Sequence, residues 1–379
     1  MSIVSEIERI KSNIANAYTA CEEKGATMPS VLNSANLFDC IASITGGVVA
    51  KQLIYMGKTT ALAKARQNAP SGNVGEYGLL CIGGNSSSTM YANIDAYKAD
   101  LTKPTNPSLS YSAHTVQVAN TTDYLLVSGG WNGSKQVSTV NSFNATLTRS
   151  IPKALTNIVR YQFGVGIGGK AIFAGGWTGS MYLNTVDVYD NNLVKTTATA
   201  LSVAKAQGCG GAIGDYALIA GGRDDNTYYD TVETYNSTLV KGTATALTVG
   251  RIQSESAKAG NKLLIAGGRI SDTALTDIVD IYTETLVKET PTTLSLPKHY
   301  FGSAEIDKHA FFCCGETGIG TSSYDNTVDM FDTHLVRTTT NTSIKKSMTK
   351  PVAVGKCLLS GGGYNGSSSQ SAVEVFSLV

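Results

Sequence analysis

A short apolar run ending in a glycine pair recurs along this chain at a nearly constant interval, and this repeat limits the fold more than any other feature. Counted from the first residue of each pair or near relative, the seven instances begin at residues 83, 129, 175, 221, 267, 314 and 361. The steps are therefore 46, 46, 46, 46, 47 and 47 residues. Self-similarity at such a period is typical of solenoids, propellers and repeat arrays.

Each period carries further matching positions. An aromatic residue follows each pair, and a β-branched residue stands three positions before that aromatic, as in Val186-Asp187-Val188-Tyr189. The apolar positions group into about four strand-length runs per period, bounded by Gly, Asn or Asp. Four strands in roughly 45 residues form one propeller blade. The sequence therefore predicts an all-β fold, a seven-bladed β-propeller.

The two ends of the repeat region predict how the ring closes. The last period stops at Val379, directly after its third strand, while residues 53–65 resemble residues 193–205, which hold a fourth strand and the lead-in to the next blade. We therefore expect residues 51–58 to pair with the C-terminal strand. The predicted propeller spans residues 51–379, and residues 1–50 form a separate helical segment.

The glycine pair followed by Val-acid-x-Tyr resembles the Kelch repeat over roughly residues 60–379. The chain departs from the family where leucines replace its usual fourth-strand Trp, at Leu147, Leu193, Leu239, Leu286 and Leu335. Acids recur at one place in the repeat, so we expect them to be structural hydrogen-bonding groups. They are Asp187, Glu233, Asp280, Asp329 and Glu374.

Composition excludes several classes of partner and cofactor. Lys and Arg total 30 against 29 Asp and Glu, which gives no electrostatic footprint for nucleic acid. No apolar stretch approaches a membrane span, and the start lacks the pattern of a signal peptide. The seven cysteines and four histidines lack metal-site spacing, so we expect no metal and no cofactor. Cys313 and Cys314 fall on a predicted strand, where neighbouring side chains point to opposite faces.

The first 50 residues carry a helical pattern. Ile3, Ile7, Ile10, Ile14, Ala17 and Cys21 are spaced as the a and d positions of heptads. A second helix is expected from Asn33-Ser34 to Gly46. The first helix either packs on its own domain or associates with copies of itself. Ile at both a and d favours three strands or more, so a trimer is the expected homo-oligomer.

The stretch from Ala17 to Pro29, with residues 33–37 and 41–44, is similar to a leader found on tail and baseplate proteins of phages that infect Gram-positive bacteria. The resemblance implies that residues 1–50 dock on other tail or baseplate proteins. It also implies a location on a virion or tail-like particle that is assembled in the host cytoplasm.

Two repeat positions vary in type between blades while staying large and polar or aromatic. The first follows the glycine pair and holds Asn85, Trp131, Trp177, Arg223, Arg269, Glu316 and Tyr364; the second opens the innermost strand and holds Arg66, Tyr111, Arg160, Lys205, Arg251, Lys298-His299-Tyr300 and Lys346. In Kelch-like folds these registers resemble the loops at one mouth of the central channel. The predicted ligand-binding residues are Trp131, Trp177, Arg223, Arg269, Tyr364, Tyr111, Arg160, Arg251, His299 and Tyr300. Such residues suit a sugar or an acidic peptide, or they cover the seams between blades.

These observations support three functions. The first is a non-enzymatic receptor-binding or adhesion protein of a phage tail or similar particle, which engages a cell-surface glycan or protein and has no catalytic residues. The alternative is a carbohydrate-active enzyme, a sialic-acid mutarotase or a glycosidase. It predicts an isolated carboxylate or Arg at the mouth, outside the repeated acid position. A third function, an intracellular Kelch-type scaffold, is disfavoured because no adaptor domain such as BTB is present.

Overall fold

The computed structural model describes residues 3–23, 28, 32–33, 51–81, 83–84, 89–320 and 323–379, with side chains from residue 11 onward. The chain divides into two units, Met1–Gln52 and Leu53–Val379. No helix in the described part of the chain has the length and apolar composition of a membrane span.

The first unit contains one described helix, α1 (Ile3–Glu23). Ile14 of this helix packs with buried Tyr18 and Cys21 and with Met28, and the Tyr18 hydroxyl donates to the Asn33 carbonyl oxygen at 2.8 Å. The side chains of Ile3, Ile7 and Ile10 and the expected second helix lie outside the described residues, so the predicted self-association through these isoleucines stays a prediction.

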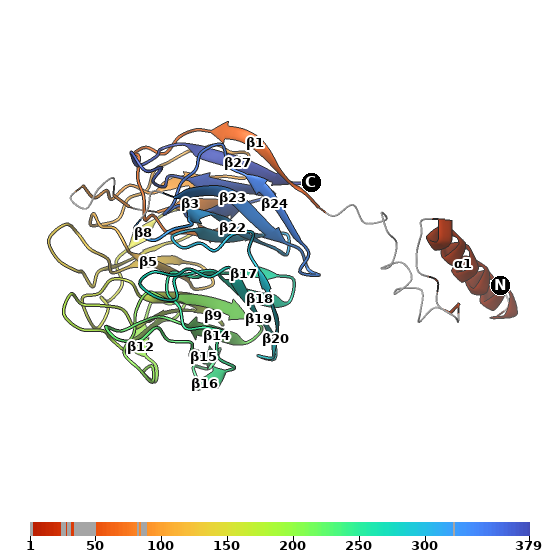
Figure 1. The fold of residues 1–379 in the computed structure, drawn as a ribbon, viewed down its shortest axis with the longest axis horizontal. Helices are drawn as coiled ribbons and strands as arrows, with labels where there is room; N and C mark the ends of the chain where they lie inside the picture. Colours follow the sequence, from red (N-terminus) through yellow and green to blue (C-terminus); the bar gives the residue numbers. More distant parts are fainter. Residues whose placement is uncertain are drawn as a thin grey trace. The chain divides into compact units, whose positions relative to one another are not determined.

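The second unit consists of seven antiparallel sheets (Figure 1). Blade 1 holds β2 (Ser71–Val74), β3 (Tyr77–Leu80) and β4 (Asp95–Tyr97). Blade 2 holds β5 (Gln117–Asn120), β6 (Leu125–Ser128), β7 (Val140–Phe143) and β8 (Arg149–Ser150). Blade 3 holds β9 (Phe163–Ile167), β10 (Lys170–Ala174), β11 (Val186–Tyr189) and β12 (Lys195–Thr197). Blade 4 holds β13 (Cys209–Ile213), β14 (Tyr216–Ala220), β15 (Val232–Asn236) and β16 (Lys241–Ala244).

The remaining blades follow the same order. Blade 5 holds β17 (Glu255–Ala259), β18 (Lys262–Ala266), β19 (Ile278–Thr283) and β20 (Lys288–Thr293). Blade 6 holds β21 (Gly302–Ile306), β22 (His309–Glu316), β23 (Tyr324–Phe331) and β24 (Arg337–Asn341). Blade 7 holds β25 (Val352–Val354), β26 (Cys357–Gly361), β27 (Val373–Leu378) and β1 (Leu53–Thr59). The first strand of each blade contacts those of its neighbours, so these strands line the axis. The predicted seven-bladed β-propeller is confirmed.

The last blade is built from both ends of the second unit. β1 pairs antiparallel with β27, from Leu53 opposite Leu378 to Thr59 opposite Val373. The register shifts between Tyr55 and Gly57, and Gly57 has a φ of +102°, which fits a β-bulge. The closing strand therefore runs from residue 53 to 59, against the expected 51–58.

Blade 1 differs from the expected four strands per period, because its described part has three. The segment after β4 turns back through a hydrogen bond from the Lys98 N–H to the Thr102 carbonyl, and then contains Pro104 and Pro107. Proline has no N–H to donate, so this segment does not continue as a paired outer strand.

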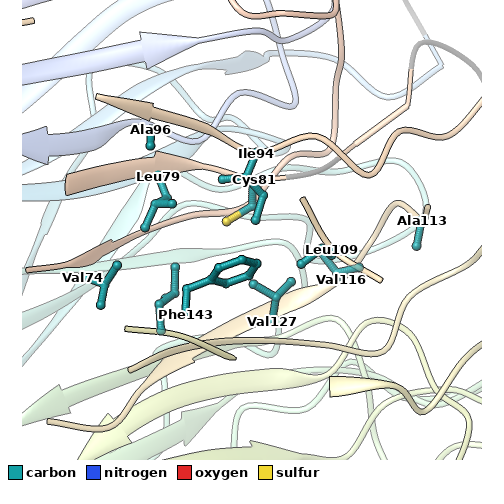
Figure 2. Close-up of a cluster of buried hydrophobic side chains, with 11 residues drawn as sticks. Val74, Leu79, Cys81, Ile94, Ala96, Leu109, Ala113, Val116, Val127 and Phe143 are labelled. Carbon is teal, nitrogen blue, oxygen red and sulfur yellow. The ribbon is translucent and has the colours of Figure 1, made fainter. Parts of the chain in front are cut away.

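The core lies between neighbouring blades, where the repeated aromatic acts as a wedge. These aromatic side chains are fully buried in all seven blades; they are Tyr97, Phe143, Tyr189, Tyr235, Tyr282, Phe331 and Phe376. Figure 2 shows Phe143 of blade 2 among Leu79, Cys81 and Ile94 of blade 1. Burying each aromatic against the preceding blade favours the constant spacing of the repeat.

The glycine pair joins each blade to the next. The N–H of Gly130 donates to the Val159 carbonyl, and a Cβ on Gly129 would lie 2.7 Å from the same oxygen, where φ is +64°. The equivalent bond across the closing seam runs from Gly363 to Arg66, so the pair in blade 7 is Gly362-Gly363 and Tyr364 follows it directly. In blade 1, Gly84 occupies the position after the pair, since it bridges Gln67 as Trp131 bridges His114. Asn85 lies outside the described residues.

Buried ion pairs explain the recurring acids. Asp280 binds Arg251 at 2.6 Å and Glu374 binds Lys346 at 2.8 Å, each within one blade. Each acid also accepts a backbone N–H from the segment that leads into its blade, as Asp280 does from Thr248 and Glu374 from Ser343. The acids thus tie successive blades together, which agrees with the structural role expected for them.

Candidate functional site

Seven residues, one from each blade, surround one mouth of the central channel. They precede the innermost strands, and all have a positive φ, between +50° and +68°, although none is glycine. We call them the mouth ring: Asn68, Thr115, Tyr161, Gln207, Gln253, Tyr300 and Met348. Left-handed backbone is disfavoured for residues with a Cβ, so seven instances at one register point to a shared constraint.

At four of these positions, Asn68, Gln207, Gln253 and Met348, the N–H donates a backbone hydrogen bond to the preceding blade. The N–H of Gln207 donates to the Tyr161 carbonyl at 3.0 Å, and the N–H of Gln253 donates to the Gln207 carbonyl at 2.7 Å. The N–H of Asn68 donates to the Met348 carbonyl at 3.1 Å, across the seam between blades 1 and 7. The turned backbone thereby links blades and leaves the ring side chains on the wall of the channel.

The mouth ring surrounds a cavity of about 170 Å³. This is smaller than the roughly 300–1,000 Å³ of drug-sized ligand sites, so it fits a small ligand or one end of a larger one. Its lining is rich in amides and aromatics: Asn68, Gln117, Gln162, Gln207 and Gln253 with Tyr161, Tyr300 and Phe301. An amide both donates and accepts, which matches the hydroxyl groups of a polyol.

Two charged side chains line this cavity, Glu255 at the start of β17 and Lys350 just before β25. They form an ion pair with each other, although they come from blades 5 and 7. The equivalent residue of blade 6 is Gly302, where a Cβ would lie 2.4 Å from the Thr349 carbonyl oxygen. The absent side chain lets Lys350 reach past blade 6. The second oxygen of Glu255 accepts from the Ser303 hydroxyl at 3.2 Å.

A polar network lies directly behind this wall. His299 is 3% exposed, and its Nδ1 lies 2.8 Å from Oε1 of Gln253. Because that oxygen only accepts, Nδ1 carries the proton. Burial lowers the pKa of His299 to about 4, so its imidazole is neutral at pH 7. Burial also raises the pKa of Glu316, which accepts from the Ser347 hydroxyl at 2.7 Å.

A second circle of residues lies outside the mouth ring, at the positions after the glycine pairs. These rim positions bridge the residues that precede the mouth ring, as Trp177 does with Arg160. The Arg160 guanidinium carbon lies 5.5 Å and 4.8 Å from the ring centroids of Trp131 and Trp177, and 4.9 Å from that of Tyr161. The structure therefore gathers both tryptophans and Arg160 beside the cavity.

The other predicted rim residues form a separate charged group. Arg269 binds Asp272 at 2.6 Å, and Arg223 lies 3.9 Å from the same carboxylate and 5.3 Å from the centre of the Tyr228 ring. Tyr364 of blade 7 packs edge-on against Tyr324 of blade 6, with 5.8 Å between the ring centroids. These side chains are half-exposed around the mouth but do not line the cavity.

Three of the predicted ligand-binding residues lie elsewhere. Arg251 is fully buried in its ion pair with Asp280, inside blade 5. Tyr111 donates its hydroxyl to the carbonyls of Gly129 and Thr139, inside blade 2. His299 lies behind the wall rather than on it. None of these three side chains lines the cavity: Arg251 is the buried cation of its blade, while Tyr111 and His299 bond to groups inside the protein.

The structure assigns to the cavity several residues that the repeat comparison missed, namely Asn68, Gln207, Gln253, Glu255, Met348 and Lys350. The mouth ring stands two positions after the buried cation in blades 1, 4, 5, 6 and 7. In blades 2 and 3 the cation is replaced by Ala113 and Val159. The sequence analysis placed Tyr111 and Arg160 at the cation position, and this hid the two-residue spacing. Repeats aligned without gaps on their glycine pairs show it.

Comparison with known proteins gives fold relatives without sequence relatives. No family model and no curated protein matches the chain. A solved structure titled "Structure of YjhT" has a TM-score of 0.55 at 14% identity and covers 71% of this chain and 96% of its own. A fungal alcohol oxidase of the AA5 family, in complex with copper, has a TM-score of 0.63 at 12% identity over 86% of this chain and 76% of its own.

The fungal relative overturns one prediction. An enzyme has the same fold over most of this chain, so the prediction of a non-enzymatic protein is wrong to exclude catalysis. In the part of the chain that the structure describes, no three His, Cys, Asp or Glu side chains form a group that could hold a metal ion. The chain is similar to both structures in fold alone.

Proposed function

We propose that this propeller is a carbohydrate-active enzyme that binds a sugar in the cavity inside the mouth ring and catalyses proton transfer on it. The single observation that carries the proposal is the Glu255–Lys350 pair, a base and an acid on the wall of a cavity otherwise lined by uncharged side chains. It is the isolated carboxylate expected for the enzymatic alternative.

The lining suits a sugar ring. The side-chain amides of Gln207 and Gln253 offer donors and acceptors to hydroxyl groups, while Tyr161 and Tyr300 offer apolar ring faces to C–H groups. The wall is held by the backbone bonds of the mouth ring and, at Gln253, by His299. Such a preformed wall lowers the cost of ordering a ligand.

Interconversion of anomers is the reaction that this pair fits. Glu255 accepts the proton of the anomeric hydroxyl while Lys350 donates one to the ring oxygen, and the ring C–O bond breaks to give the open-chain carbonyl form. Rotation about the adjacent carbon–carbon bond, reclosure and return of both protons give the other anomer. Positioned acids and bases contribute typically 10²–10⁴-fold to such transfers.

A glycosidase fits less well. Most glycosidases flank the scissile bond with two carboxyl groups. Of the residues that the structure places on the cavity wall, Glu255 alone is a carboxylate. Glu316 lies behind the wall, with Ser347 and beside His299.

The test is to follow anomer ratios by NMR after dissolving single anomers of neutral, amino and acidic sugars with the purified chain. We expect faster equilibration of at least one sugar and a loss of about 100-fold in the Glu255→Gln variant. The matched control is Glu305→Gln, which removes a carboxylate of blade 6 that is paired with Lys258 of blade 5. No acceleration with any sugar, or full activity in Glu255→Gln, would refute the proposal.

The roles of residues 1–50 stay predictions: docking on a tail or baseplate, trimer formation and a place on a particle. They are compatible with this proposal, since a particle that meets a cell surface also meets its glycans. A cell-surface glycan or protein as the partner also stays a prediction.

A further inference from the structure

Cys314 occupies a place in the repeat where blades 2, 3, 4, 5 and 7 have glycine and the sequence of blade 1 has Ile82. The equivalent residues Gly129, Gly175, Gly221, Gly267 and Gly362 have φ between +57° and +69°, and Cys314 has a φ of +63°. Glycine adopts this backbone without a steric penalty, whereas a residue with a Cβ does not. Glycine suffices for this turn in five blades, so the turn alone does not explain the thiol group at Cys314.

The left-handed turn also changes where the two neighbouring thiols point. On a regular strand, Cys313 and Cys314 would face opposite sides of the sheet. In the structure their sulfur atoms lie 3.2 Å apart, and both side chains are fully buried. Cys313 Sγ lies 3.5 Å from the Ser360 hydroxyl, and Cys314 Sγ lies 3.5 Å from the Thr342 hydroxyl. The expectation of opposed side chains is corrected by this turn.

A buried cation makes the two thiols unequal. Lys346 is fully buried and binds Glu374 at 2.8 Å and the Ser360 carbonyl at 3.1 Å, in the blade that follows. Burial opposes ionisation of Cys314, but the Cys313 thiol and the Lys346 ammonium together lower its pKa. The hydrogen bond to Cys314, with burial, raises the pKa of Cys313. Ionisation of Cys314, with Cys313 as its hydrogen-bond donor, is thus favoured over ionisation of Cys313.

We propose that Cys313 and Cys314 are a reversible oxidation site that forms a disulfide between adjacent residues, with a peroxide as the oxidant. The Cys314 thiolate attacks one peroxide oxygen, the O–O bond breaks, and sulfenic acid and hydroxide form. The Cys313 sulfur then displaces the sulfenic oxygen. In total, two thiols and hydrogen peroxide give one disulfide and two water molecules, with two electrons passing from sulfur to oxygen.

The geometry predicts slow formation and easy reversal. Because both thiols are buried, peroxide reaches them only through local opening of the seam between blades 6 and 7, so the rate is limited by that opening. Neighbouring Cα atoms are 3.80 Å apart across a trans peptide, below the usual 4.4–6.8 Å of disulfides. Strained disulfides are readily reduced, so dithiothreitol should restore both thiols.

The test is mass spectrometry of the full chain after incubation with hydrogen peroxide, followed by acid quenching and blocking of free thiols with N-ethylmaleimide under denaturing conditions. We expect a species 2 Da lighter before blocking, with two thiols protected in the peptide that contains residues 313 and 314, and reversal by dithiothreitol. The mass change is that of two hydrogen atoms lost in disulfide formation.

The control is Cys314→Gly, which installs the residue found in five other blades and therefore keeps the turn. This variant should lose the lighter species while its remaining cysteines react as before. The wild-type peptide map needs no variant, so the proposal stays testable if Cys314→Gly folds poorly. Full alkylation of both thiols after peroxide, or a bridge between other cysteines, would overturn it, and neither outcome bears on sugar turnover.

Discussion

At the residues that open the innermost strands, one backbone angle determines what faces the channel. A positive φ turns the N–H of each bonded mouth-ring residue toward the preceding blade and leaves its side chain on the cavity wall. Two positions earlier in most blades, a cation is buried against the repeated acid. Two positions of one repeat, two residues apart, thus line the cavity and hold the buried ion pair separately, although both hold polar residues.

Arg251 and Arg269 allow this separation to be measured. Arg251→Ala removes the fully buried partner of Asp280 and leaves Lys288 as its remaining cation, which should cost about 3 kcal/mol of unfolding free energy. Arg269→Ala removes a half-exposed pair with Asp272 and should cost less than about 1 kcal/mol. Urea denaturation of both variants measures the difference. Equal losses would mean that Arg251 is not structural.

His299 should make stability fall as the pH falls. Its folded-state pKa of about 4 lies below the usual 6.5, so the unfolded chain takes up a proton first between these values. The slope is at most on the order of 1 kcal/mol per pH unit. Denaturation curves from pH 7 to pH 4 should show a smaller decline for His299→Gln, whereas exposed His334→Gln should match the wild type. Parallel declines in all three proteins would contradict a neutral, buried His299.

Among the elements, β1 matters most for closing the ring, because the first strand of the propeller in sequence supplies the outer strand of the last blade. Tyr55 packs on the wedge residue Phe376 at 5.4 Å, and Leu53 and Leu378 share one buried cluster. Without β1, β27 presents an unpaired edge.

Truncation separates β1 from the helical segment. A chain that begins at residue 60 should lose at least about 2 kcal/mol, since it loses a buried leucine and the pairing of β27. A chain that begins at residue 46 keeps β1 and should unfold like the full chain. The measurement is the midpoint of urea denaturation, compared at an unchanged slope of unfolding free energy against urea concentration. Similar midpoints for the two truncated chains would show that β1 does not close the ring.

The elements also show how far the sequence could predict this structure. The number of blades, the buried aromatic wedge and the strand order follow from a period that each blade must satisfy to pack on the last. The register of the first and last blades could not be predicted from the period. In the last blade, Gly361-Gly362-Gly363 contains two overlapping glycine pairs that fit the period equally well. Pro104 and Pro107 indicate that the segment after β4 forms no outer strand in the described part of blade 1. The constant period nevertheless favoured the prediction of four strands.

On the scale of the whole molecule, the site was harder to predict than the fold. Packing repeats from blade to blade, so a sequence reveals it through self-similarity. A ligand site is made of differences between blades, such as Glu255 opposite Lys350 and glycine between them. Their meeting depends on the distance across the axis, which no repeat comparison contains. The rim tryptophans were found because Trp is rare in this chain, whereas the glutamines of the wall were too common to stand out.

The seam between blades 1 and 7 gives the central cavity a second importance. The pairing of β1 with β27 closes the ring without a covalent link, and the Asn68–Met348 bond joins the same two sides within the cavity wall. A ligand that contacts Asn68 and Met348 together would hold the two sides of the ring closed. Its binding free energy would then add to the free energy needed to open the ring. A ligand that binds this cavity more tightly should therefore also raise the temperature at which the propeller unfolds.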